Sequence, residues 1–142
     1  MAYQIQRIPD GLPAAKAPLR ILVVDDNVAV VQTLGQMIEA MGHKARIATD
    51  GVRALTEAKE FLPHVVLLDI GMGNMNGYEV CQVMKQAPEM KRTMFIAQTG
   101  WDKDENEGMS REAGFDHYLT KPVRMKELET LFAEAIRAEF EP

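Results

Sequence analysis

Short apolar runs alternate with helix-like stretches from about residue 20 onward, and this alternation constrains the fold more than any other feature of the sequence. Five runs are typical of strands, over residues 21–24, 45–48, 65–68, 94–97 and 117–119. Parallel strands need long crossover connections, which are usually helices, whereas antiparallel strands can be joined by tight turns. The alternation therefore predicts an α/β fold whose parallel sheet is wound on both faces by right-handed crossovers.

Helical periodicity fills the intervals between these strands. The clearest apolar stripes belong to the first and last helices: Val31, Leu34, Ile38 and Met41, followed by a stop at Gly42, and Met125, Leu128, Phe132 and Ile136. Further helices are expected over 52–61 and from just after Gly77 through Met84. The stretch 103–113, interrupted by Gly108, is a weak fourth helix that is either a solvent-facing connector or a mobile element used for switching.

Length and composition fit a single domain. The chain has 142 residues, of which we expect 1–19 to be an irregular arm or linker, 20–138 to form the domain and 139–142 to be a tail. No apolar run approaches the roughly 20 residues that cross a bilayer, and the lone Cys81 cannot form an internal disulfide. A cytoplasmic location without membrane insertion is therefore expected. The net charge of −5, without a basic block, argues against direct binding of nucleic acid.

Polar residues follow four of the five strands. Asp25 and Asp26 follow the first strand, Asp69 the third, Thr99 the fourth and Lys121 the fifth. Functional side chains of open α/β sheets gather beyond the carboxyl ends of the strands, so these groups should converge. Three carboxylates held close together repel one another unless a cation lies among them. Because the donors are all oxygen atoms, Mg²⁺ is the favoured ion, with Mn²⁺ as the alternative.

This set of groups suits the transfer of a phosphoryl group to an aspartate. A metal ion, the Lys121 ammonium and the Thr99 hydroxyl would together stabilise the oxygens of the arriving group. Each residue also has a structural explanation. Asp25, Asp26 and Asn27 could simply offer a cap for the next helix, and Asp69 could belong to a glycine-rich turn. Thr99 could be an ordinary strand residue and Lys121 a solvated lysine. Four strand ends with complementary groups favour the functional explanation.

Five segments resemble the CheY-like receiver domain of two-component response regulators, over about residues 20–138: ILVVDDN, HVVLLDI, MNGYEV, IAQTG and YLTKPV. The resemblance implies a flavodoxin-like, doubly wound five-stranded parallel sheet in the order 2-1-3-4-5, with five helices. It implies a signalling phosphoacceptor in a phosphorelay rather than an enzyme. A histidine kinase or histidine phosphotransfer protein would be the phosphodonor, and a protein target would bind the surface of helix 4, strand 5 and helix 5.

The resemblance also assigns individual residues, with Asp69 as the phosphoacceptor. It implies metal ligands at Asp25 (mainly through bound water), Asp26, Asp69 and the Gly71 backbone carbonyl, phosphoryl-binding groups at Thr99, Gly100 and Lys121, a switch pair of Thr99 and Tyr118, and a cis peptide bond before Pro122. Segments TGW and AGFDHYLTKPV look similar to receivers attached to hybrid histidine kinases. A stand-alone regulator and a piece of such a kinase both remain open.

Two departures from the family pattern concern the loops around the acceptor. Gly73 stands where the family commonly has proline, which gives a looser loop. Gly71 and Trp101 stand at positions that tune phosphate loss, and neither offers an acid or amide to orient water. Slow self-dephosphorylation is therefore expected.

Three alternative functions fit these residues less well. A metal-dependent phosphatase would place a second acid two residues after the nucleophile, where this chain has Gly71. A flavodoxin-like cofactor binder would hold its phosphate near Asp25 and Asp26, which would repel it. A receiver that serves only as an interaction module would not need all five site side chains.

The remaining reactive residues are expected to be structural. His43, His64 and His117 are expected at the surface or at the edge of the core, without a role as phosphodonors. Cys81 is expected to be a small buried apolar residue.

Overall fold

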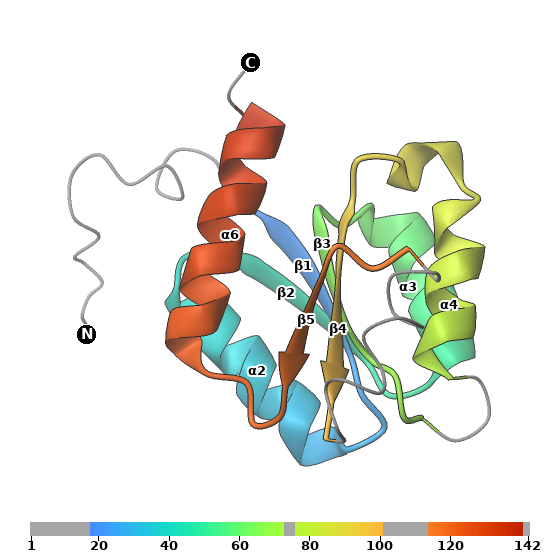
Figure 1. Cartoon of the computed structure of the whole chain (residues 1–142), viewed down its shortest axis with the longest axis horizontal. Helices are drawn as coiled ribbons and strands as arrows, with labels where there is room; N and C mark the ends of the chain where they lie inside the picture. Colours follow the sequence, from blue (N-terminus) through green and yellow to red (C-terminus); the bar gives the residue numbers. More distant parts are fainter. Residues whose placement is uncertain (1–17, 73–75, 101–113, 141–142) are drawn as a thin grey trace.

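The computed structural model describes residues 18–72, 76–100 and 114–140. Its centre is a parallel sheet in the order β2-β1-β3-β4-β5 (Figure 1). The strands are β1 (Arg20–Val24), β2 (Lys44–Ala48), β3 (Val65–Asp69), β4 (Met94–Thr99) and β5 (His117–Thr120). All five expected strands and the expected strand order are confirmed.

Four α-helices lie within the described residues. They are α2 (Val28–Ala40), α3 (Gly51–Phe61), α4 (Gly77–Lys85) and α6 (Met125–Phe140), and a short 3-10 helix, η2 (Pro88–Met90), follows α4. They correspond to four of the five expected helices. The weak candidate over 103–113, residues 1–17 of the expected arm over 1–19, Gly73 and Trp101 lie outside the described residues.

The helices cover both faces of the sheet. In Figure 1, α2 and α6 lie on one side and α3 and α4 on the other. Alternate side chains of β1 enter two separate cores, since Ile21 and Val23 pack with α2 and α6 while Leu22 and Val24 pack with α3 and α4. Every residue of β3 is buried. A central parallel strand covered on both faces has no polar face, which explains its continuous apolar sequence.

Polar caps start the helices directly after the strand ends. The Asn27 side chain accepts hydrogen bonds from the backbone N–H groups of Ala29 (2.9 Å) and Val30 (3.3 Å) at the start of α2. Asp50 caps α3, and Asn76 caps α4. Such caps contribute about 1 kcal/mol each. Asn27 is thus the residue that caps the first helix, and Asp25 and Asp26 are left for another role.

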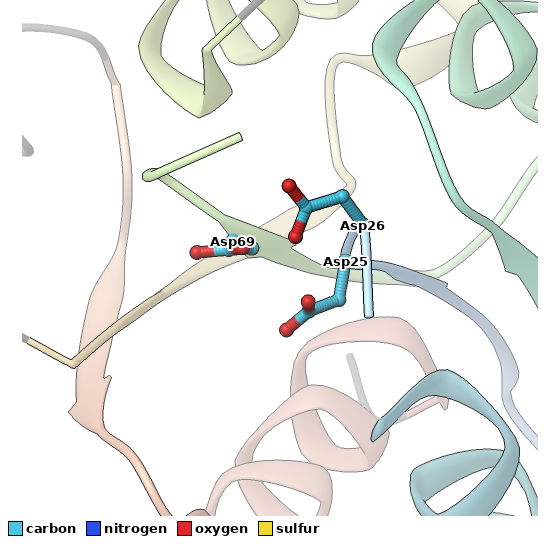
Figure 2. A group of neighbouring side chains, drawn as sticks. All are labelled: Asp25, Asp26 and Asp69. Atoms are coloured by element: carbon cyan, nitrogen blue, oxygen red, sulfur yellow. The ribbon is translucent and has the colours of Figure 1, made fainter. Parts of the chain in front are cut away.

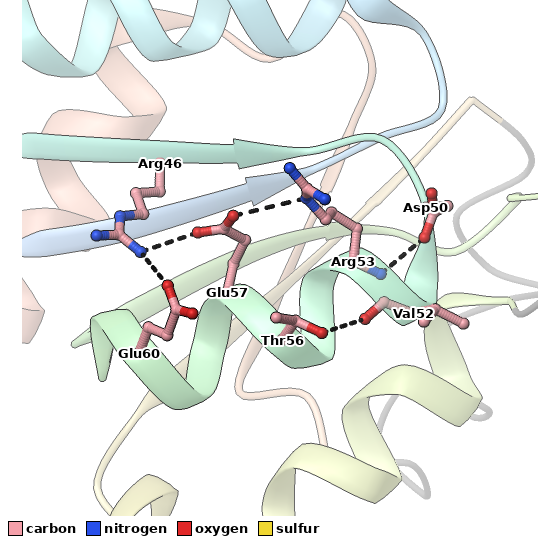
Figure 3. Close-up of polar contacts among 7 residues, drawn as sticks. All are labelled: Arg46, Asp50, Val52, Arg53, Thr56, Glu57 and Glu60. Carbon is pink, nitrogen blue, oxygen red and sulfur yellow. Dashed lines mark hydrogen bonds and ion pairs between the residues drawn. The ribbon is translucent and has the colours of Figure 1, made fainter.

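The edge strand β2 is held against α3 by a charged cluster (Figure 3). Arg46 Nη1 lies 2.9 Å from Glu57 Oε1 and 3.4 Å from Glu60 Oε1. The Arg46 guanidinium also lies 4.9 Å from the centre of the Phe61 ring. Exposed pairs of this kind contribute at most about 1 kcal/mol. The partly exposed edge position explains why the apolar run of β2 is weak.

Two structural expectations need correction. The α6 stripe is buried at Leu128, Phe132 and Ile136, but Met125 is 41% exposed because it stands at the first position of the helix. His43 is buried rather than at the surface or core edge, with only 6% of its surface exposed.

A backbone contact explains the burial of His43. Its Nδ1 accepts a hydrogen bond from the Leu19 backbone N–H at 3.0 Å, and its ring packs edge-on against Phe132. His64 Nδ1 accepts in the same way from the Arg20 backbone N–H at 2.9 Å. The two imidazoles therefore hold the chain where it enters β1.

Cys81 is fully buried, as expected for a small apolar residue.

Among the residues that the structure describes, no helix combines the length and the apolar character needed to cross a bilayer.

Candidate functional site

Three aspartates lie together where β1 and β3 end (Figure 2). Asp25 and Asp26 follow β1, and Asp69 is the last residue of the neighbouring strand β3. One carboxylate oxygen from each residue lies within 4.8 Å of the others. Asp25 and Asp69 are buried, whereas Asp26 is exposed. The pairing of β1 with β3 therefore brings together the three carboxylates expected to converge.

Lys121 brings a positive charge to this group. Its Nζ lies 2.8 Å from Asp25 Oδ2 and 3.4 Å from Asp69 Oδ2. Its backbone N–H donates to the Thr99 carbonyl at 2.7 Å, and the peptide bond that joins it to Pro122 is cis. The residue after β5 is thus tied to the end of β4 and directed toward the ends of β1 and β3.

Backbone N–H groups orient the two buried carboxylates. The Asn27 N–H donates to Asp25 Oδ1 at 2.9 Å, and the Gly71 N–H donates to Asp69 Oδ1 at 3.0 Å. In each carboxylate the Oδ1 atom is held by the main chain while the Oδ2 atom faces Lys121. The two aspartates are therefore fixed in the same way before any ligand binds.

Burial and charge shift the pKa values of two groups here. Burial raises the pKa of Asp69 and the nearby Asp25 raises it further, which together outweigh the Gly71 N–H and Lys121. Burial alone would lower the pKa of Lys121, but Asp25 and Asp69 outweigh that effect and raise it. The lysine is therefore held as an ammonium, and Asp69 is a carboxylate that additional positive charge would stabilise.

A cavity of about 250 Å³ opens over these groups. It is lined by Asp25, Asp26, Asn27, Asp69, Gly71, Thr99, Gly100 and Lys121. A side-chain carbon placed on Gly100 would meet nothing within 4 Å, so space is open on that side. All residues expected to bind the metal or the phosphoryl group line this one cavity.

The donor set fits a divalent cation. Asp25 Oδ2 is buried, and the Lys121 ammonium lies 2.8 Å from it. When ionised, three carboxylates and one ammonium carry a net charge of −2. Oxygen donors alone suit a hard ion such as Mg²⁺. Asp25, Asp26 and Asp69 are the side chains that could hold it.

Gly77 is a part of the site that sequence reasoning missed. A side-chain carbon there would lie 2.5 Å from the Asp69 carbonyl oxygen and 2.7 Å from the Ile70 Cα, closer than atoms can approach. The first residue of α4 therefore packs directly on the backbone of the strand end that carries Asp69. The sequence offered only a glycine at a helix start, without any sign of this contact.

Tyr118 and Pro122 do not line the acidic cavity. Tyr118 is partly buried and packs against the core on the α3 and α4 side of the sheet. Pro122 is exposed beside Lys121. A switching role for Tyr118 therefore rests on the family resemblance.

Comparison with known proteins identifies a family and several relatives. The family described as the response regulator receiver domain matches residues 21–133. The DNA-binding response regulator MtrA of Mycolicibacterium paratuberculosis is 35% identical over 109 residues, which is 77% of this chain and 47% of that protein. The response regulator MprA of Mycobacterium sp. strain KMS is 34% identical over 111 residues, with 78% and 47% covered. The chain spans about half the length of these curated relatives.

Solved structures share the fold. A CheY-like receiver domain protein from Methanospirillum hungatei has a TM-score of 0.78 at 28% identity, covering 89% of this chain and 100% of that one. The chemotaxis protein CheY4 of Vibrio cholerae has a TM-score of 0.79 at 24% identity, covering 84% and 99%. The chain therefore shares its fold with CheY4, although only 24% of the aligned residues are identical.

Proposed function

The chain belongs to the response regulator receiver domain family, and on that premise we propose that it accepts a phosphoryl group on Asp69 in two-component signalling. One observation carries the proposal. The Asp69 carboxylate opens into a cavity that is also lined by two further acids, a hydroxyl, a glycine and an ammonium from three other strand ends. Charge and donors are thus gathered where a transferred phosphoryl group would have to be stabilised.

In the proposed reaction an oxygen of the ionised Asp69 carboxylate attacks phosphorus. A P–O bond forms to Asp69 as the P–N bond of a phosphohistidine breaks, and the released imidazole takes up a proton. The Gly71 N–H, which donates to Asp69 Oδ1 at 3.0 Å, keeps the carboxylate oriented during the attack. The product is an aspartyl phosphate, and the chain acts as a signalling acceptor that assists its own modification rather than as an enzyme with turnover.

The groups around Asp69 would share the charge of the phosphoryl oxygens. The Lys121 ammonium would bind one oxygen, and the Thr99 hydroxyl and Gly100 N–H would donate to others. Asp26, Asp69 and the Gly71 carbonyl would hold Mg²⁺ directly, or Mn²⁺ in its place, with Asp25 acting mainly through bound water. When bound, the ion would supply the positive charge that this pocket of acids lacks.

The proposed donor is a histidine kinase or a histidine phosphotransfer protein. The proposed output is binding of a protein target through the helix 4, strand 5 and helix 5 surface that the family resemblance implies, in which strand 5 is β5 and helix 5 is α6. Thr99 and Tyr118 are the proposed switch pair. MtrA is named as a DNA-binding protein and is about twice as long as the matched region. For this chain the net charge of −5 supports a protein target rather than direct contact with nucleic acid.

The decisive experiment is phosphorylation of the purified chain with acetyl phosphate and Mg²⁺, followed by intact mass. The parent should gain the mass of one phosphoryl group, and Asp69→Asn should gain none. Asp50→Asn is the matched control, because Asp50 also follows a strand but lies outside the cavity, and asparagine retains the cap of α3. Equal labelling of the parent and Asp69→Asn would overturn the proposal. Continuous release of phosphate from small phosphate esters would instead indicate a phosphatase.

A further inference from the structure

Gln98 is a polar side chain in a position built for an apolar one. It lies on the interior strand β4 with none of its surface exposed, and among the residues that the structure describes neither its amide nitrogen nor its amide oxygen has a hydrogen-bond partner. Met94 and Ile96, four and two residues earlier, pack in the core beneath α2 and α6. Because side chains alternate along a strand, Gln98 faces the same side of the sheet.

An unpaired amide at this depth is costly. A buried donor or acceptor without a partner destabilises the folded state by about 1–3 kcal/mol. An apolar residue of similar size would avoid this cost. Met94 and Ile96, on the same face of β4, are apolar. The Gln98 amide is therefore suited to a partner that enters from outside the chain.

A second cavity reaches Gln98 from the α2 side. Its volume is about 340 Å³, and it is separate from the acidic cavity except for Lys121, which lines both. The lining residues are Ala29, Val30, Thr33, Leu34 and Met37 of α2, Gln98, and Lys121, Pro122 and Val123 of the β5–α6 connection. An apolar wall with a few polar groups, in a volume of roughly 300–1,000 Å³, is typical of small-molecule sites.

Contact with the amide requires one lining side chain to move. Gln98 lines the cavity but has no exposed surface, so its amide lies just behind the cavity wall. Met37 lines the same cavity and is only partly buried. A methionine has three rotatable bonds and adapts readily to an irregular ligand. Met37 is therefore the lining side chain whose rotamer we expect to change when a ligand enters.

The charges nearby argue for a neutral ligand. The Lys121 ammonium, the one cationic group among the described lining residues, is already 2.8 Å from Asp25 and 3.4 Å from Asp69. A carboxylate or phosphate in this cavity would lack a free cation and would approach these two acids. A carboxamide offers a donor and an acceptor side by side, so an amide-like group can satisfy both of its atoms at once.

We propose that the cavity between α2 and the β5–α6 connection binds a small neutral molecule with an apolar body and an adjacent donor and acceptor, such as a primary amide or a lactam. The amide edge of the ligand pairs with the Gln98 carboxamide, and its body packs against Val30, Leu34 and Val123. A bound molecule also lies beside Lys121. The site thus adjoins the acidic cavity without sharing its carboxylates.

Benzamide is the probe for this site, with toluene as the probe that lacks an amide. The full chain, labelled with ¹⁵N, is titrated with each and followed by two-dimensional NMR. Benzamide should shift the Gln98 side-chain NH₂ signals and the backbone amides of Ala29, Val30 and Thr33, and the shifts should saturate. In Gln98→Leu the benzamide affinity should fall about tenfold or more, the loss of a good pair of hydrogen bonds, while the toluene affinity should not fall.

Controls keep the outcome clear. Gln98→Leu should fold, because it removes an unpaired amide, and Gln98→Met is the second variant if leucine packs poorly. Asp69→Asn should bind benzamide with the same affinity as the parent. A loss of phosphorylation and a loss of benzamide binding can therefore be told apart. Absence of saturable shifts in the parent would mean that the amide has at most a water partner and would overturn the proposal. Equal benzamide affinity in the parent and Gln98→Leu would also overturn it.

Discussion

Lys121 Nζ lies 2.8 Å from Asp25 Oδ2, closer than the 3.4 Å that separates it from the corresponding oxygen of Asp69. The ammonium is therefore engaged mainly with the acid of β1 and not with the acid proposed to accept the phosphoryl group. Both carboxylates are held from behind by backbone N–H groups at Oδ1. The lysine is the group that can turn from one acid toward an incoming anion without disturbing either of them.

Replacement of Lys121 by methionine should slow phosphorylation far more than it disturbs the fold. Methionine keeps the apolar stem but removes the ammonium, so phosphoryl oxygens lose one charged donor. Loss of one such donor lowers rates by roughly 100-fold or more. The measurement is the rate of labelling by acetyl phosphate with Mg²⁺, and Lys126→Met, at an exposed position on α6, is the control. A parent-like rate in Lys121→Met would contradict the role assigned to the ammonium.

Asp25→Asn should weaken Mg²⁺ binding without unfolding the site. The asparagine oxygen can still accept from the Asn27 N–H, but one negative charge is lost from the cluster. We expect the affinity for Mg²⁺ to fall by about 10-fold or more, as for other changes around a bound ion. Calorimetric titration with MgCl₂, in the absence of any phosphodonor, measures this directly. Asp50→Asn should bind Mg²⁺ as the parent does, and an unchanged affinity in Asp25→Asn would exclude Asp25 from the ion site.

Two glycine-to-alanine changes should have opposite effects on stability. At Gly77 the new methyl group would meet the Asp69 carbonyl oxygen at 2.5 Å, so α4 must shift and the free energy of unfolding should fall by about 1–3 kcal/mol. At Gly35, inside α2, the methyl group would only touch Ile47 Cγ2 at 3.4 Å. Alanine is favoured over glycine within a helix by up to about 1 kcal/mol, so Gly35→Ala should be neutral or stabilising.

Urea denaturation of both variants gives these free energies. Phosphorylation of Gly77→Ala should also slow, because the clash is with the backbone of the acceptor. Equal stability of the two variants would show that α4 does not pack on Asp69 as described.

The buried imidazole of His43 should make the fold less stable in mild acid. Burial, and to a smaller extent the nearby His64, lowers the pKa of His43 from 6.5 to about 4. Between pH 4 and pH 6.5, His43 is protonated in the unfolded chain but stays neutral in the folded chain. The free energy of unfolding therefore falls as the pH drops from about 6.5 toward 4. The full effect of such a shift is roughly 3 kcal/mol.

Asparagine at position 43 tests this dependence, because it can accept from the Leu19 N–H but does not titrate. Urea denaturation of the parent and His43→Asn at pH 7 and at pH 5 should show a smaller loss of stability in the variant. The baseline of the variant will be lower, since the ring contact with Phe132 is lost. Only the difference between the two pH values is diagnostic, and an equal loss in both proteins would contradict the assignment.

The aspartyl phosphate should decay slowly. Gly71 lines the cavity beside Asp69 and has no side chain with which to orient an attacking water. After removal of acetyl phosphate, intact mass should show the labelled chain persisting well beyond seconds. Gly71→Asn, which adds an amide at this position, should shorten that lifetime. Decay of the parent within seconds would contradict the expectation.

Much of the fold could be predicted because its determinants are local. The apolar runs that became β1 and β3 are continuous, since both faces of a central parallel strand are buried, and each residue that follows them could be identified directly. Asp25, Asp69 and Lys121 could be grouped in advance because the carboxyl ends of parallel strands share one edge of the sheet.

The sequence by itself thus determined the order of the strands and helices along the chain. It also identified the acids, the hydroxyl and the ammonium at the strand ends, and the receiver family that the chain resembles. Only the tertiary structure decided that Gly77 touches the Asp69 backbone, that His43 is buried against Phe132, and that the Gln98 amide has no hydrogen-bond partner within the described part of the chain. Each of these depends on how closely elements distant in the chain approach one another. Periodicity in the sequence indicates which face of a helix or strand is buried. It carries no information about the distance from that face to the atoms of the element packed against it.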